Sequence, residues 1–162
     1  MARPSADPTL IDMIRMQLSQ EINRPVETVF DYFSDCRNET QWNPFVKTID
    51  KIGDGPIGLD ARFRGDYPGV GSAEFVISVY EFPHRVGFQG AFPPMAFDML
   101  ATCRTLPGGQ GTHFDFVGEF RPRGLFKLLS PLMAIKMRRD FATRGVALKR
   151  ALESSPAPPA IC

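Results

Sequence analysis

The chain has 162 residues, which is enough for one domain with a substantial buried core. Apolar residues make up 43% and charged residues 23%, the net charge is +1, and no apolar run approaches the ~20 residues that span a membrane. The N-terminal segment lacks the apolar region of a secretory signal, and Cys36, Cys103 and Cys162 match no metal-ligand spacing, so we expect a reduced, cytoplasmic protein without disulfides or metal.

We expect one folded domain over residues 11–153, between two disordered tails. Residues 1–10 are largely polar and contain prolines, and residues 154–162 are too rich in proline to join a helix or strand. Between the tails the sequence has no internal repeat, no low-complexity linker and no shift in composition that would indicate a second domain.

The first predicted element is a strand over residues 14–22, in which Ile14, Met16, Leu18, Gln20 and Ile22 occupy alternate positions. Pro25 then suits the first turn of a helix, where a missing N–H costs nothing. Ser34-Asp35 ends this helix and can cap a second, short one that ends near Trp42. The apolar side chains of the first helix follow at helical spacing, at Val26, Val29, Phe30 and Phe33.

From Phe45 to Arg121 the pattern is typical of about six strands separated by turns in an antiparallel meander. The turn signals are Gly53-Asp54-Gly55-Pro56, Pro68-Gly69, Pro83-His84, Pro93-Pro94 and Pro107-Gly108-Gly109.

Residues 122–153 are predicted to form a long helix that Pro131 interrupts. Its inner stripe runs through Met133, Met137, Phe141, Gly145, Leu148 and Leu152. From Arg121 onward the chain carries nine basic residues and only two acidic ones, an asymmetry that indicates either a surface for anionic partners or simply a solvated helix face.

The order of these elements, together with Arg24-Pro25-Val26-Glu27-Thr28-Val29-Phe30 and Trp42-Asn43-Pro44, resembles the START-like (SRPBCC) helix-grip superfamily. The branch that it resembles most is that of the polyketide cyclase/dehydrase and lipid-transport-type proteins. The resemblance implies an α+β fold in which a curved antiparallel sheet of about seven strands wraps around the long C-terminal helix and encloses a hydrophobic cavity. Because the superfamily includes carriers, receptors and enzymes, the fold alone does not decide the function.

Strand alternation predicts which side chains face the interior of such a fold. One face of each strand is aromatic, methionine-rich and nearly uncharged, and the ionisable groups lie opposite it, where Asp98, Arg104, Arg62, Arg64 and Glu74 are placed for cross-strand pairs. The apolar face is either plain core or the wall of a ligand cavity, for which Gly65, Gly118 and Gly145 would leave room. The candidate ligand-binding residues are Trp42, Phe63, Tyr67, Phe75, Ile77, Phe88, Phe97, Met99, Phe114, Phe116, Met137 and Phe141.

Trp42 has two interpretations of equal weight. It either anchors the short helices to the sheet or lies near the cavity mouth with Asn43, where its ring would touch the ligand.

The sequence assigns no catalytic residue, metal ligand or cofactor. It has no phosphate-binding loop and no nucleophile elbow, and His84 and His113 fall at a turn and on a polar strand face. The polar side chains that could reach the interior are Tyr32, Asn43, Tyr67, Tyr80 and Cys103.

Three hypotheses follow. The first, which the apolar interior favours, is a protein that binds or transports a hydrophobic small molecule such as a lipid, a quinone or a polyketide-like aromatic compound. The second is a polyketide cyclase or dehydratase, which requires a polar cluster inside the cavity. The third is an interaction module that meets an anionic membrane or a protein through Lys136, Arg138, Arg139, Lys149 and Arg150.

We expect no nucleic-acid partner, because no aromatic platform is interleaved with basic residues on a sheet face. The oligomeric state is not predictable from this pattern.

Overall fold

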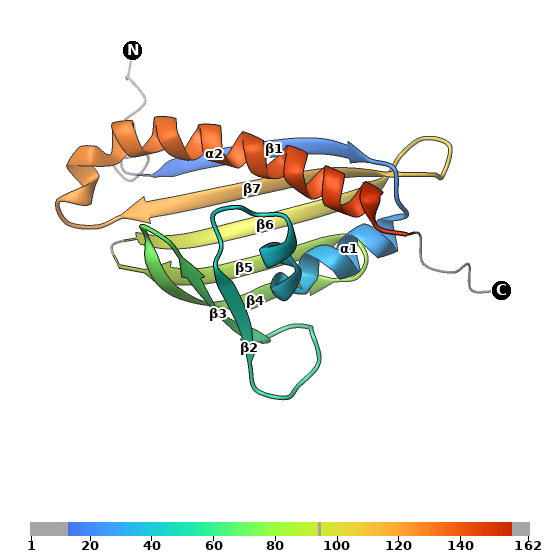
Figure 1. The fold of residues 1–162 in the computed structure, drawn as a ribbon, viewed down its shortest axis with the longest axis horizontal. Coiled ribbons are helices and arrows are strands. Elements are labelled where there is room, and N and C mark those ends of the chain that lie inside the picture. Colours follow the sequence, from blue (N-terminus) through green and yellow to red (C-terminus); the bar gives the residue numbers. More distant parts are fainter. Residues whose placement is uncertain (1–12, 94, 157–162) are drawn as a thin grey trace, which may run out of the picture.

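A computed structural model describes residues 13–93 and 95–156 of the chain. Two short helices, α1 (Val26–Ser34) and the 3-10 helix η2 (Cys36–Gln41), follow the first strand, and the long helix α2 (Phe126–Ser154) follows the last one (Figure 1). The strands are β1 (Ile14–Ile22), β2 (Thr48–Ile52), β3 (Arg62–Tyr67), β4 (Gly71–Glu81), β5 (Arg85–Phe92), β6 (Met95–Thr105) and β7 (Thr112–Pro122).

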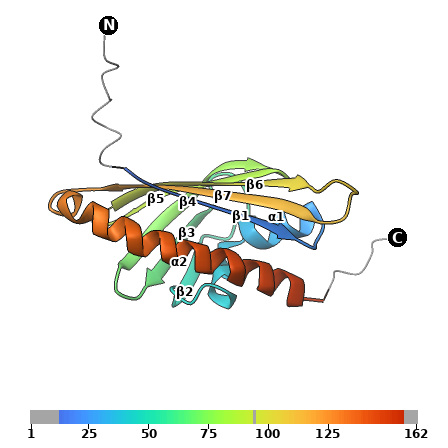
Figure 2. The same ribbon diagram turned by 90° about the horizontal axis from the view of Figure 1, so that it is seen from above.

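The strands form one antiparallel sheet in the order β1-β7-β6-β5-β4-β3-β2, so the first strand pairs with the last one. The sheet is curved, and α2 runs along its inner side next to β1, as Figures 1 and 2 show from two directions. This arrangement confirms the predicted α+β helix-grip architecture. The sheet does not close into a barrel, because β1 and β2 lie at opposite edges of the strand order.

The alternation predicted for the strands agrees with their burial. Phe97 pairs with Phe120 and Cys103 with Phe114 across β6 and β7, and all four side chains are buried on the inner face. The opposite face carries ion pairs, as predicted for the charged strand residues. These pairs are Arg64 with Glu74, Arg121 with Asp98, and Arg104 with Asp115.

The predicted boundary between the last strand and the last helix was wrong. Pro122 does not begin the helix but ends β7, where it pairs with Met95. Gly124 then adopts a positive φ of 60°, and the helix begins at Phe126. Since the alternating pattern and the helical pattern overlap at this point, the sequence could not fix the boundary.

Pro131 does not interrupt α2, which runs continuously past it. A proline at this position removes the N–H that would bond the Lys127 carbonyl one turn earlier. The Ser130 hydroxyl donates to that carbonyl at 2.7 Å instead. The substitute hydrogen bond lets the helix continue through its second turn.

The C-terminal end of α2 is fixed to the turn that follows β1. The Arg24 guanidinium donates to the carbonyl oxygens of Glu153 and Ser155, at 2.6 and 2.8 Å, and so satisfies two acceptors at the helix end. The Asn23 backbone N–H donates to the Glu153 carboxylate at 2.9 Å. Helix α2 therefore extends through Ser154, one residue into the predicted tail, while residues 1–12 and 157–162 lie outside the described part of the chain.

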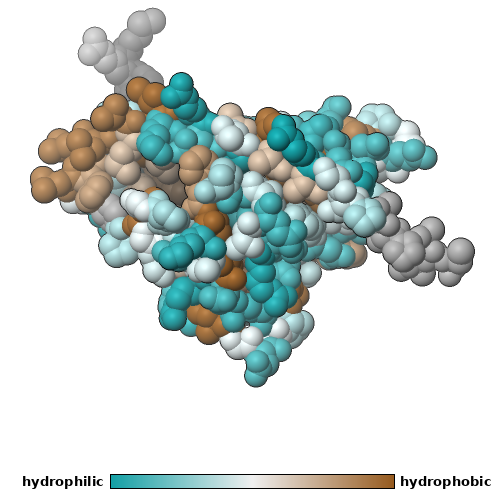
Figure 3. Space-filling view, viewed as in Figure 1, coloured by the Kyte–Doolittle hydropathy of each residue, from teal (hydrophilic) through white to brown (hydrophobic). Residues whose placement is uncertain are grey.

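Most large apolar side chains are buried, but the beginning of α2 is an exception. Figure 3 shows apolar side chains gathered on the surface at the end of the molecule where this helix begins. Among the helices that the structure describes, none is both long enough and apolar enough to cross a membrane.

Candidate functional site

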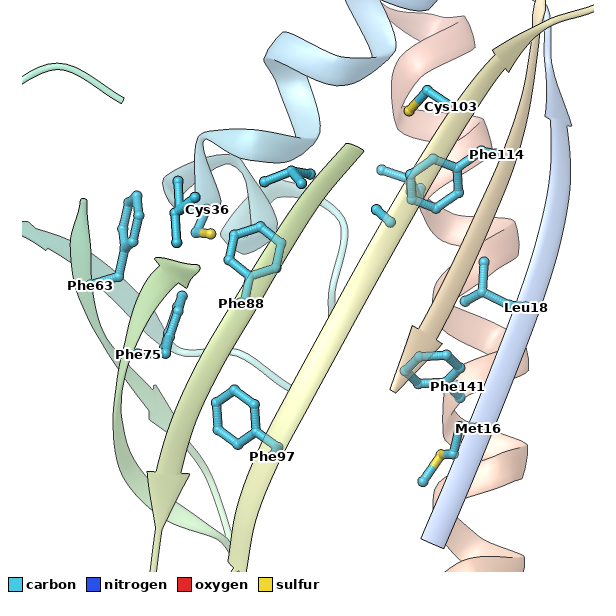
Figure 4. Packing of buried hydrophobic residues seen from close by; sticks show 14 of the residues in the cluster. Met16, Leu18, Cys36, Phe63, Phe75, Phe88, Phe97, Cys103, Phe114 and Phe141 are labelled. Atoms are coloured by element: carbon cyan, nitrogen blue, oxygen red, sulfur yellow. The ribbon is translucent and has the colours of Figure 1, made fainter. Parts of the chain in front are cut away.

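A cavity of about 350 Å³ lies between the inner face of the sheet, the α1–η2 segment and α2. This volume is at the lower end of the ~300–1,000 Å³ that is typical of ligand pockets. Phe75, Phe88 and Phe97 follow one another across neighbouring strands, and Phe114 and Phe141 lie nearer α2 (Figure 4). The predicted site residues that line the cavity are Trp42, Tyr67, Phe75, Phe88, Phe97, Met99, Phe114, Phe116, Met137 and Phe141.

Two of the predicted site residues, Phe63 and Ile77, are not in the cavity wall. Both are fully buried, and the Phe63 ring stacks on Phe75 with 5.6 Å between ring centroids. Phe75 therefore presents its ring to the cavity and Phe63 supports it from behind. Strand alternation identifies the inner face but does not distinguish a wall residue from the core beneath it.

The glycines predicted to leave room do not enlarge the cavity. A Cβ atom at Gly65 would lie 2.7 Å from Cε2 of the Tyr67 ring, and one at Gly118 would lie 2.9 Å from the Phe120 ring. At Gly145, a Cβ would lie 3.2 Å from the Gln20 side chain of β1. The space above these glycines is already filled by neighbouring side chains, and Gly145 allows α2 to approach β1 closely.

The apolar wall is held by contacts between aromatic rings. The Phe33 ring of α1 makes edge contacts with Phe114 and Phe116, at 4.9 and 5.1 Å between centroids. Phe116 in turn stacks on Phe141 of α2, at 5.2 Å and an interplanar angle of 12°. Such pairs add about 0.5–1.5 kcal/mol each beyond the burial of their area. They join α1, β7 and α2 into one wall, which sequence reasoning identified only in part because it did not include Phe33.

One end of the cavity is polar, and the sequence analysis named Tyr67 and Asn43 as polar candidates but missed Glu39 and Arg144. Glu39 of η2, Tyr67 of β3 and Arg144 of α2 all line the cavity. The buried Asn43 side chain donates to the Glu39 carboxylate at 2.5 Å and accepts from the Phe45 backbone N–H at 3.0 Å. Because Asn43 is held by the backbone, it fixes the orientation of the Glu39 carboxylate.

The Arg144 side chain is only partly satisfied. Its guanidinium lies over the Phe45 ring, 5.3 Å from the centroid, in a cation–π contact. Its Nε is buried and has no hydrogen-bond partner among the described residues. A buried donor without an acceptor is costly, so the side chain would gain free energy from an acceptor oxygen.

The surroundings shift the pKa values of the other two groups. Burial raises the pKa of the Glu39 carboxyl, and the Asn43 hydrogen bond and the Arg144 charge only partly oppose this effect. Burial also raises the pKa of the Tyr67 hydroxyl, and the nearby Glu39 carboxylate raises it further. Tyr67 therefore keeps its proton at neutral pH and can act as a hydrogen-bond donor in the cavity.

The opening of the cavity lies between the β3–β4 turn and α2. Pro68, Gly69 and Val70 of this turn and Lys136 of α2 are the lining residues that are exposed. Lys136 pairs with Asp140 at 2.7 Å. Trp42 is half-buried and belongs to the lining, so it contacts the cavity as well as packing against the core.

The remaining polar candidates divide into two groups. Tyr32 lines the cavity, and its hydroxyl donates to Gln41 at 3.2 Å. Tyr80 instead packs edge-on against Phe30, with 5.2 Å between ring centroids, and Cys103 is a free thiol whose pKa is raised by burial to about 12. Neither of these two is part of the lining.

The histidines do not reach the cavity. His113 lies on the outer face with its Nε2 3.2 Å from Asp115, and His84 Nδ1 lies 3.2 Å from the Cys103 carbonyl oxygen. Within residues 13–93 and 95–156, no three His, Cys, Asp or Glu side chains are grouped so that they could hold a metal ion.

Residues 13–153 match the sequence profile of a family described as polyketide cyclase/dehydrase and lipid transport. No curated protein sequence matches the chain significantly.

Several solved structures are similar in fold. One is the di-domain ARO/CYC BexL from the BE-7585A biosynthetic pathway, with a TM-score of 0.68 and 17% identity over 90% of this chain. The match covers 52% of BexL, so this chain spans about half the length of BexL. TTHA0849 from Thermus thermophilus has a TM-score of 0.68 and 16% identity, over 87% of this chain and 99% of that protein. SA2116 from Staphylococcus aureus, a protein of unknown function, also has a TM-score of 0.68, with 11% identity over 88% of this chain and 94% of its own. Since all three identities are low, these likenesses show a shared fold and no more.

Proposed function

Because this chain belongs to the polyketide cyclase/dehydrase and lipid transport family, we propose that it binds a small molecule that has an apolar body and an oxygen-bearing end. Family membership supports a ligand-binding or cyclase role in general. The observation that carries the more specific proposal is the buried Arg144 Nε, which lacks a partner among the described residues and belongs to the polar end of a mainly apolar cavity.

The body of the ligand would bind by the hydrophobic effect. Burying apolar surface is favourable by ~25 cal/mol per Å², and Phe, Met and Leu side chains make up most of the cavity wall. The rings packed around Phe33 and Phe116, some edge to face and some stacked, form a wall that is suited to a flat or extended molecule. A lipid, a quinone and an aromatic polyketide share this apolar character.

The oxygen-bearing end of the ligand would lie against Glu39, Tyr67 and Arg144. Arg144 and Tyr67 can both donate hydrogen bonds, so together they would suit a carbonyl, enolate, phenolate or carboxylate oxygen. Such a group would supply the acceptor that Arg144 Nε lacks within the described part of the chain. Orientation of the ligand would then come from these donors and affinity from the aromatic wall.

Uptake of the neutral fluorescent probe N-phenylnaphthylamine tests whether the cavity is a binding site. Met99 lines the cavity, and its neighbour Leu100 projects from the opposite face of β6. We expect one probe per protein in the wild type, loss of binding in Met99→Trp because the indole fills the cavity, and normal binding in Leu100→Trp. A wild type that takes up no probe, and from which no apolar compound is released by solvent extraction, would contradict the proposal.

The polar end also favours a second candidate, cyclisation or dehydration of a polyketide-type substrate. Acid–base chemistry of this kind needs a group whose pKa lies closer to neutrality than that of an ordinary carboxyl. Burial shifts the pKa of Glu39 in this direction, and Tyr67 and Arg144 are placed to stabilise negative charge on a substrate oxygen. Glu39→Gln would separate the two functions, because it removes the base while keeping the shape of the cavity: turnover would be lost and probe binding retained.

A further inference from the structure

The first turns of α2 carry apolar side chains on the side that faces solvent. They recur every three or four residues and therefore form one stripe along the helix. We call this stripe the α2 apolar patch; it consists of Leu125, Leu128, Leu129, Leu132 and Ile135, which are 79%, 79%, 52%, 70% and 67% exposed.

The patch is not the exposed edge of the core. Met133, Met137 and Phe141 occupy the other side of the same helix and face the cavity or the sheet. A surface helix normally carries polar residues opposite its buried stripe, so a helix segment that is apolar on both sides needs a second apolar environment. Figure 3 shows the patch at one end of the molecule, beside a hollow in the surface.

The charges around the patch are basic. From Arg121 to Arg139 the chain contains no acidic residue, and Arg123, Lys127, Arg138 and Arg139 flank the apolar stripe. Of these, Arg123, Arg138 and Arg139 form no ion pair with any residue that the structure describes. An apolar stripe flanked by uncompensated positive charge is complementary to a bilayer with anionic headgroups above hydrocarbon.

We propose that the α2 apolar patch docks this protein on an anionic membrane surface. The first turns of α2 lie in the headgroup region with the patch directed into the acyl chains, and Arg123, Arg138 and Arg139 contact the headgroups. The contact is made by the beginning of α2 and not by its end. Lys149, near the C-terminal end, is already bound to the Glu153 carboxylate and the Glu21 carbonyl.

Docking in this orientation brings the cavity close to the lipid. Met133, Lys136 and Met137 line the cavity and belong to the same stretch of α2 as the patch. The β3–β4 turn, which carries the exposed Val70, lies at the same end of the molecule (Figure 2). An apolar ligand could therefore move between bilayer and cavity with little exposure to water, although docking itself does not depend on the proposed ligand.

Co-sedimentation with vesicles made of equal parts phosphatidylcholine and phosphatidylglycerol tests this inference. We expect the wild type to bind these vesicles and to bind pure phosphatidylcholine vesicles far less. Leu128→Gln combined with Leu132→Gln should weaken binding about tenfold or more, because it removes apolar insertion while keeping helix propensity and charge. Val146→Gln is the matched control: Val146 is 51% exposed on the same helix but outside the patch, and its loss should leave binding unchanged.

Three results would overturn the inference. The first is absence of wild-type binding at low salt, and the second is equal binding by the wild type and the Leu128/Leu132 variant. The third is a wild-type dimer that dissociates in this variant without any lipid binding, which would mean that a second copy covers the patch. If that variant does not fold, Leu125→Gln with Leu129→Gln removes the other half of the patch and decides between the same outcomes.

Discussion

Replacing Arg144 by methionine gives the most direct test of how the polar end of the cavity works. The substitution keeps an unbranched side chain against Phe45 but removes the guanidinium and its unpartnered Nε. If Arg144 binds an oxygen-bearing group, the variant should lose affinity for anionic ligands and retain affinity for neutral ones. The predicted change is therefore selective and not a general weakening.

The expected size of the effect follows from the strength of a charged hydrogen bond. Such a bond contributes about 1.5–3 kcal/mol in a protein. Each 1.4 kcal/mol corresponds to a tenfold change in the dissociation constant, so the loss should be about 10- to 150-fold. Because Arg144 is only half-buried, solvent screening favours the lower end of this range.

Two related fluorescent probes provide the assay. Anilinonaphthalene sulfonate carries an anionic group, and N-phenylnaphthylamine has a similar aromatic body without charge. In Arg144→Met, the dissociation constant of the first should rise about tenfold or more, and that of the second should stay within about threefold. Arg150→Met, which removes an exposed charge elsewhere on α2, should change neither. Equal weakening of both probes would show that Arg144 only shapes the wall, and no change in either would refute its role in binding.

Two further predictions concern stability. In a urea titration, Gly90→Ala should lower the free energy of unfolding by about 1–3 kcal/mol, because the new Cβ would lie 2.6 Å from the Glu74 carbonyl oxygen and from Phe75 Cβ. Gly55→Ala is the control: its Cβ would meet nothing within 4 Å, so the free energy of unfolding should change by less than about 0.5 kcal/mol. The second prediction is a pH dependence. Burial raises the folded-state pKa of Glu39 above its ordinary 4.5, so folding favours the protonated carboxyl and the stability from this group falls as the pH rises from 4.5 through the folded-state pKa. Glu39→Gln should remove this decline and be more stable than the wild type at neutral pH; parallel pH profiles would contradict the assignment.

The fold was predictable because its information is local and repeated. Each strand alternates between apolar and polar side chains, and the long helix carries a stripe through Met137, Phe141 and Leu148, so strand faces and the helix face could be identified from periodicity alone. The order of these elements then indicated the family. The boundary at Pro122 was missed because a strand pattern and a helix pattern overlap there.

Two charged groups at the polar end of the cavity, Glu39 and Arg144, were not predicted, for two different reasons. Glu39 lies on a short 3-10 helix, for which no long periodicity exists, and only tertiary contacts bring it to the cavity. Arg144 did carry a signal: it follows Met137 by seven residues and Phe141 by three, which places it beside the inner stripe of α2. It was counted instead only as one of the nine basic residues from Arg121 onward. Charged residues at such positions are worth considering as inward-facing groups.

The pairing of β1 with β7 has a consequence for how the chain reaches its folded state. The two partners are separated by most of the sequence, and α2, which covers the aromatic inner face, comes after both. During synthesis, β2 to β6 emerge before the sheet can acquire its β1–β7 pairing and before α2 can cover Phe88, Phe97 and Phe114. Long-range pairing of this kind folds slowly and leaves apolar surface uncovered in the meantime. The aromatic inner face of the nascent sheet therefore stays exposed to solvent until α2 has left the ribosome. The chain is most prone to aggregation in that interval.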